Sequence, residues 1–160
     1  MLRRTSWAAT LSAQDFDRAC EGTCERVVPN AVFVCRKGEA VDHWFGVIEG
    51  LAKMSSDWAT GKTASFTGIA AGGWFGEGSM LKPEPRRYDV IALRDSRVAC
   101  VRRDTFLWLL DHDIAFNRFI INQINERLGL FIGLLESERL ADTDARVARA
   151  ITALFHPVLQ

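Results

Sequence analysis

The chain has 160 residues, of which 48% are apolar, and its 20 basic side chains balance its 20 acidic ones. That is enough apolar material for one domain with a proper core and one appended element. The balanced charge excludes the overall basic field of a stand-alone nucleic-acid binder. The basic start at Arg3 and Arg4 has no sustained apolar run behind it, and no stretch approaches the ~20 apolar residues of a membrane span. We therefore expect a soluble, cytoplasmic protein.

The first half of the chain is dominated by short segments with strand character. A short helix is predicted over residues 14–21, ending at Gly22. β-Branched and aromatic content then predicts strands over residues 31–36, 44–49, 51–56 and 63–69, with a hairpin loop over 57–62. The four cysteines lack CxxC spacing, so reduced thiols are expected, with Cys35 and Cys100 buried inside strands.

An irregular passage over residues 72–88 concentrates glycines, one carboxylate and one guanidinium between strands. Gly76 and Gly78 can adopt backbone angles closed to other residues, so the amides that follow can converge as a nest or a short helical turn. Such amides favour a phosphate, and Arg87 supplies the counter-charge. Glu77 would repel a phosphate, so its expected role is to accept hydrogen bonds from a hydroxyl pair such as a ribose. The passage thus predicts a site for a nucleotide with an internal phosphodiester.

Further strands are predicted over residues 88–93 and 97–102, and many short strands at regular spacing indicate an antiparallel roll or barrel. Asp104 is a suitable N-cap for a short apolar helix over residues 105–110. The predicted fold class is therefore mainly β plus α: an antiparallel β-roll, or double-stranded jelly roll, with short helices and a long C-terminal dimerisation helix.

The long helix is predicted over residues 114–140. Four apolar residues repeat at heptad spacing, and they are Ile114, Ile121, Leu128 and Leu135. Additional apolar residues widen this face, and they are Phe116, Phe119, Ile120, Leu130 and Leu134. We therefore expect the helix to pack on the roll and on the same helix of a second copy, giving a homodimer. The alternative is a core helix of a monomer. A further helix is predicted over residues 145–155, with its start at residues 142–144.

The passage over residues 72–88 resembles the phosphate-binding cassette of the cyclic nucleotide-binding domains in Crp/Fnr transcription regulators. The match consists of Phe75-Gly76-Glu77, Leu81 and Arg87. The resemblance implies that Glu77 holds the ribose 2′-hydroxyl, while Arg87 and the amides of Gly76, Gly78 and Ser79 hold the cyclic phosphate of cAMP or cGMP. It also implies a non-enzymatic effector sensor.

Three positions depart from the family pattern. Tyr88 stands where the family has a Ser or Thr that contacts phosphate, and Phe131 and Ile132 stand where polar residues read the purine. The resemblance divides the chain into a sensor roll over residues 1–112, a dimerisation helix over 113–141, and over 142–160 a hinge with the first helix of a truncated winged helix-turn-helix domain. DNA is then contacted only through a domain absent from this chain.

Several alternatives stay open. The same fold can bind a different anionic effector or none, serving as a dimerisation or interaction module. Glu77 and Arg87 can form a structural ion pair, and Arg86 and Arg94 either extend the basic side of the pocket or are solvated. A metal-dependent jelly-roll enzyme needs clustered ligands, whereas the three histidines are scattered along the chain. We therefore expect no metal centre.

Overall fold

The computed structural model describes residues 2–57, 63–82 and 84–140, together with residues 143, 144, 147, 148 and 151. Eight strands form two antiparallel four-stranded sheets, in the orders β1-β8-β3-β6 and β2-β7-β4-β5. The strands are β1 Thr23–Val28, β2 Phe33–Cys35, β3 His43–Glu49, β4 Leu51–Asp57, β5 Thr63–Ala70, β6 Trp74–Phe75, β7 Asp89–Ala92 and β8 Ser96–Arg102. The mainly β plus α roll predicted from the sequence is confirmed.

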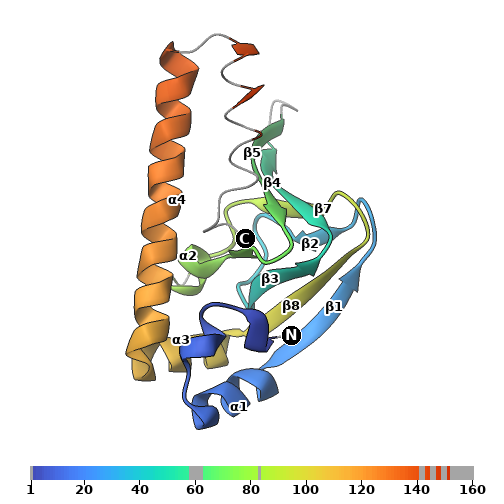
Figure 1. Cartoon of the computed structure of the whole chain (residues 1–160). Helices are drawn as coiled ribbons and strands as arrows, with labels where there is room; N and C mark the ends of the chain where they lie inside the picture. The colour runs from blue at the N-terminus through green and yellow to red at the C-terminus, as the bar shows by residue number, and fades with distance from the viewer. Residues whose placement is uncertain are drawn as a thin grey trace.

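Helices cover one side and one end of this roll (Figure 1). They are the 3-10 helices η1 Leu2–Arg4 and η2 Ala8–Thr10, and the α-helices α1 Ala13–Glu21, α2 Glu77–Met80, α3 Arg103–His112 and α4 Ile114–Leu140. In the figure α4 stands along one side of the roll, and α2 lies between it and the strands. The short helix that the cassette glycines allow therefore forms where two parts of the fold meet.

The middle strand β3 is buried on both faces, which explains its nearly continuous apolar sequence. Phe45 points into the core between the two sheets, together with Phe75, Val90 and Val98. Trp44 points the other way, into a second core under the helices. The two cores share the strands β3, β6 and β8, so the roll and its helical cover form a single packed unit.

The second core joins the N-terminal segment to the start of α4 through aromatic rings. Trp7 is 1% exposed, and its ring centroid lies 5.2 Å from that of Trp74 and 5.4 Å from that of Phe116. Trp44 and Trp74 are 4.2 Å apart. Edge-to-face and offset pairs of this kind add about 0.5–1.5 kcal/mol each beyond their buried area. The first turns of α4 are therefore fixed to the roll.

Two local predictions need correction. The strand β1 was not predicted, because four consecutive residues of this edge strand are exposed and it shows no apolar alternation. Asp104 is not the N-cap of α3: the cap position is Arg102, and the Asp104 carboxylate accepts a hydrogen bond from the adjacent Thr105 amide at 2.6 Å inside the first turn.

The long helix has the bounds predicted from its heptads, Ile114–Leu140. Asp113 separates it from α3 and accepts a hydrogen bond from the Phe116 amide at 2.6 Å, as an N-cap does. Phe116 and Ile120 are buried against the roll, as expected for the widened face, whereas the side chain of Leu134 is outside the described set. Most of the helix predicted over residues 145–155, the tip of the hairpin loop over 58–62 and His156 also lie outside the described residues.

Candidate functional site

The cassette glycines place a one-turn helix beside α4. Gly76 has φ 96°, a left-handed conformation that L side chains rarely adopt, and it precedes α2 directly. Its carbonyl oxygen accepts from the amides of Ser79 and Met80, each at 3.1 Å. The first amides of a helix have no partner within it, so those of Glu77 and Gly78 are available to an anion. The sequence prediction of a short helical turn here agrees with the structure.

Glu77 is the buried acid of the site. The residue is 3% exposed, and its Oε1 accepts a hydrogen bond from Arg127 of α4 at 2.5 Å. Its second oxygen, Oε2, is buried and has no hydrogen-bond partner among the described residues. A buried carboxylate oxygen without a donor is costly, so this atom is a candidate acceptor for a ligand hydroxyl.

Two side chains of α4 bind β6, the short strand just before α2. Arg127 also donates to the backbone carbonyl of Trp74, and the Nε2 of Gln123 donates to the same oxygen at 3.0 Å. Gln123 is 2% exposed. The carboxylate of Glu77 and the position of α4 are therefore coupled through direct hydrogen bonds.

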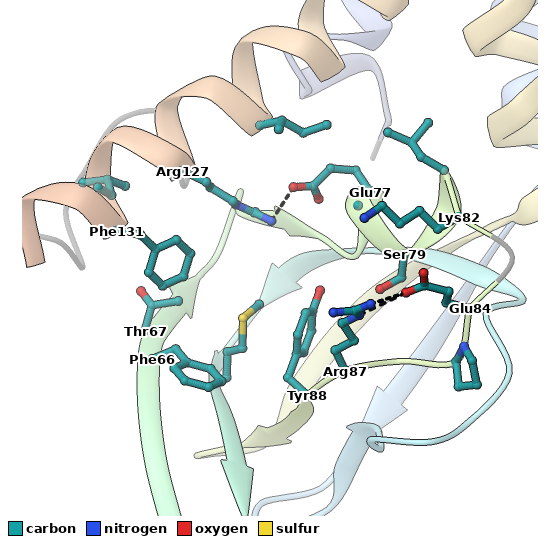
Figure 2. Close-up of a pocket in the computed structure, with 16 residues that line it drawn as sticks. Phe66, Thr67, Glu77, Ser79, Lys82, Glu84, Arg87, Tyr88, Arg127 and Phe131 are labelled. Atoms are coloured by element: carbon teal, nitrogen blue, oxygen red, sulfur yellow. Dashed lines mark hydrogen bonds and ion pairs between the residues drawn. The ribbon is translucent and has the colours of Figure 1, made fainter. Parts of the chain in front are cut away.

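Arg87, the predicted phosphate ligand, lies at the exposed end of the site. Its side chain is 73% exposed, and its Nε donates to the Glu84 carboxylate at 3.1 Å, which lowers the pKa of that carboxyl. The alternative ion pair between Glu77 and Arg87 is not formed, because each residue is paired elsewhere. Figure 2 shows Arg87 and Glu84 next to Ser79, with Lys82 on the same side.

Arg86 is the buried guanidinium of the site. It is 3% exposed, packs over the Phe45 ring at 4.8 Å, and donates through Nη2 to the His43 carbonyl at 2.6 Å. Its Nη1 is buried without a partner among the described residues and lies 3.2 Å from where a Cβ on Gly76 would stand. The unpaired donor is therefore next to the start of α2.

A period of two explains why Arg86 rather than Arg87 points inward. In β7 the buried residues are Val90 and Ala92, and counting back by twos reaches Tyr88 and Arg86. Tyr88 packs against the core between the sheets. The same alternation was present in the sequence and could have distinguished the two arginines.

Tyr88 contributes a hydroxyl in the middle of the site. Burial, and then the negative charge of Glu77, raise the pKa of the Tyr88 phenol to about 12. The group therefore stays protonated at neutral pH and can donate a hydrogen bond. Figure 2 shows the ring with its hydroxyl directed toward the space below Arg127.

A cavity of about 650 Å³ is lined by Glu77, Arg87, Tyr88 and Arg127, whereas Arg86 is not among its lining residues. Of the predicted site residues, its walls include Glu77, Gly78, Ser79, Arg87, Tyr88 and Phe131. Phe75 is instead 0% exposed in the core, Gly76 is the N-cap of α2, and Ile132 is not among the lining residues. Lining residues that were not predicted as site residues are Met54, Phe66, Thr67, Leu81, Lys82, Glu84, Pro85, Ile124, Arg127 and Leu130.

Arg127 was the most important omission. It stands three and four residues before Leu130 and Phe131, so all three share one face of α4. A single guanidinium on the apolar face of a helix is a signal that it has a buried partner, although the sequence does not say which.

The family of cyclic nucleotide-binding domains has a sequence model that matches residues 25–113. The chain belongs to this family. The matched segment runs from β1 through α3 and includes the whole cassette. Among curated proteins, no sequence matches the chain.

Solved structures of a regulator's sensor domain, of a catabolite activator and of a kinase regulatory domain share its fold. The sensor domain of the transcriptional regulator DNR from Pseudomonas aeruginosa matches with a TM-score of 0.72 at 16% identity, over 82% of this chain and 89% of that one. Catabolite Activator Protein from Thermus thermophilus matches with a TM-score of 0.68 at 20% identity, over 82% of this chain and 63% of its own. The regulatory domain of Toxoplasma gondii PKA with cAMP matches with a TM-score of 0.67 at 22% identity, over 78% and 47%. At these identities the matches establish the fold.

Two features of the described residues bear on other classes of site. None of the described helices combines the length and the apolar character that crossing a bilayer requires. Within the same part of the chain, no three histidine, cysteine or acidic side chains come together as metal ligands.

Proposed function

We propose that this chain is the effector-sensing and dimerisation region of a Crp/Fnr-type transcription regulator, and that it binds a cyclic nucleotide or a similar phosphate-bearing ligand without chemical conversion. The observation that carries the proposal is the buried carboxylate of Glu77, with one oxygen paired to Arg127 and the other without a described partner at the cavity. A ribose hydroxyl supplies the missing donor. Family membership makes this ligand class the natural one to test.

The phosphate is proposed to bind at the start of α2. The amides of Glu77 and Gly78 point out of the first turn, and the Ser79 side chain lines the cavity next to them. The unpaired Nη1 of Arg86 lies next to Gly76 and is proposed to donate a charge-assisted hydrogen bond to the phosphate. Arg87, already paired with Glu84 and exposed, supplies a second cation at the mouth only if that pair opens.

The matched variants Arg86→Gln and Arg87→Gln distinguish the contributions of the two arginines to ligand binding. Each variant is titrated with cAMP by calorimetry. A lost charge-assisted hydrogen bond costs about 1.5–3 kcal/mol, so Arg86→Gln should weaken binding by roughly 10- to 150-fold. An exposed pair such as Arg87 with Glu84 contributes ~1 kcal/mol or less, so Arg87→Gln should weaken binding by about fivefold at most.

Circular dichroism melting of both variants, and of Arg86→Lys, controls for folding. If Arg87→Gln abolishes binding while a folded Arg86→Gln binds normally, the role proposed for Arg86 is refuted and the sequence prediction for Arg87 stands. If wild-type protein gives neither heat nor a thermal shift with cAMP or cGMP, the ligand assignment itself fails.

Signal transmission is proposed to run through α4. A ligand that bonds Glu77 contacts a group already bonded to Arg127, so it interacts with the roll and the helix together. Such a ligand can favour one placement of α4 relative to the roll. A DNA-binding domain following this helix would then be reoriented, as in a transcription regulator.

Homodimerisation is proposed through the heptad face of α4. Its four residues, Ile114, Ile121, Leu128 and Leu135, are between 56% and 72% exposed. A seam of large apolar residues along one helix is unusual on a monomer surface. Sedimentation of Leu128→Lys should therefore show a monomer, whereas Asn122→Lys, at an exposed polar position about 100° around the helix from the heptad face, should leave the dimer intact. A wild-type chain that sediments as a monomer at tens of micromolar contradicts the proposal.

A second candidate is a dimerisation or interaction module without an effector. It is favoured by the pairing of Arg87 with Glu84 and by the apolar character of Phe131 and Ile132. This candidate predicts a dimer that does not bind either cyclic nucleotide.

A further inference from the structure

The cavity has a polar end and an apolar end. Figure 2 shows Ser79, Lys82, Glu84 and Arg87 on one side, and Phe66, Thr67 and Phe131 on the other. Glu77, Arg127 and Tyr88 lie between these two groups. A ligand held through a hydroxyl at Glu77 and an anionic group near α2 therefore extends its remaining part toward the two phenylalanines.

Large apolar side chains are left partly exposed at this second end. Phe66 is 37% exposed and Phe131 is 40% exposed, and both line the cavity. Phe66 comes from β5 and Phe131 from α4, and the described ring contacts do not pair these two rings with each other. Apolar groups gathered around a hollow with a polar rim are typical of a ligand site.

The side chains at this end can form almost no hydrogen bonds with the edge of a base. The lining residues that Figure 2 labels at this end are Phe66, Phe131 and Thr67. The Thr67 hydroxyl donates to the Gly68 carbonyl at 3.1 Å. Hydrogen bonds to ring nitrogens and exocyclic groups are what distinguish one base from another, and stacking is tolerant because every base has a π-face.

We propose that the Phe66 and Phe131 end takes the flat ring of the ligand by stacking, and that the site therefore binds cyclic purine nucleotides without discriminating between adenine and guanine. This inference rests on the proposed function and adds its ligand class. The rings of Phe66 and Phe131 supply the contact, while Glu77 and the start of α2 set the orientation of the ligand.

The test is calorimetric titration of the full chain with the cyclic monophosphates of adenosine, guanosine and inosine. The expected dissociation constants agree within about threefold. Stacking on an aromatic side chain contributes roughly 5- to 150-fold in affinity, so Phe131→Leu should weaken all three ligands by such a factor, and by the same factor. Phe131→Tyr keeps the ring and should bind like wild type, and Asn125→Ala on the same helix is the surface control.

The possible outcomes distinguish failure of this inference from failure of the proposed function. A preference of more than tenfold for one purine overturns the inference and leaves the proposed function standing. Unchanged binding in both Phe131→Leu and Phe66→Leu also overturns it. If none of the three nucleotides binds, the proposed function fails, and the inference fails with it. Both phenylalanines are partly exposed, so melting temperatures close to wild type are expected for these variants.

Discussion

The ion pair between Glu77 and Arg127 provides the sharpest prediction about stability. The side chains are 4% and 17% exposed, so the pair is largely removed from water. Replacing Arg127 by Met keeps the unbranched apolar stem of the side chain but leaves a buried carboxylate with no described partner on either oxygen. Breaking one partner of a buried pair costs about 3–5 kcal/mol. Since a domain has ~5–15 kcal/mol in total, this is a large fraction of its stability.

The matched variant Glu77→Gln removes the charge and retains an acceptor for Arg127. It should cost roughly 1–3 kcal/mol, because the guanidinium also donates to the Trp74 carbonyl. The double variant should cost less than the sum of the two single variants, since a neutral amide needs no counter-ion.

Urea and thermal denaturation of the four proteins measure this cycle. For a chain of this length about 2–4 °C corresponds to 1 kcal/mol, so Arg127→Met should melt roughly 6–20 °C below wild type. An Arg127→Met variant within 1 kcal/mol of wild type, or strictly additive losses, would refute the claim that Arg127 neutralises Glu77.

Two further predictions concern glycine positions and thiols. Gly38 has φ 87° and a Cβ there meets nothing within 4 Å, so Gly38→Ala should lower the free energy of unfolding by only about 1–2 kcal/mol. Gly50 has φ 108° and its new Cβ would lie 2.8 Å from the Ser96 Cα, so Gly50→Ala should lower it by roughly 2–5 kcal/mol. Equal melting temperatures of the two variants would contradict this. Burial raises the pKa values of Cys35 and Cys100 from 9.0 to about 11, so the folded state holds these protons more tightly than the unfolded state and stability should fall as pH rises from 9 to 11. The Cys35→Ala, Cys100→Ala double variant should lose less stability than wild type between pH 9 and 11. If the free energy of unfolding of both proteins has the same slope against pH, the two thiols do not contribute.

The sequence predicted best those helices and strands in which apolar residues recur regularly along the whole element. The heptads of α4 gave its bounds, and the cassette glycines gave the turn at α2 because Gly76 requires a left-handed backbone. The strand β1 was missed since it lies at a sheet edge with Glu25 and Arg26 exposed, so burial leaves little trace in its sequence.

The site was predicted less completely than the fold, for a physical reason. Glu77 finds its partner Arg127 fifty residues away along the chain, a pairing that only the packing of α4 on the roll determines. Arg86 and Arg87 are neighbours of the same residue type just before β7, and Arg86 is buried whereas Arg87 is exposed. Tyr88 and Phe131 were predicted as site residues, and both line the cavity. Their roles toward a ligand stay predictions.

The central claim, that Glu77 accepts a ribose hydroxyl in the cavity between the roll and α4, is tested most directly by comparing cAMP with its 2′-deoxy analogue in calorimetric titrations. The missing hydroxyl leaves the Glu77 Oε2 without a donor, which costs about 1.5–3 kcal/mol. The account predicts saturable binding of cAMP and binding of the analogue that is roughly 10- to 150-fold weaker. Equal affinity for the two ligands, or no binding of either, would contradict it.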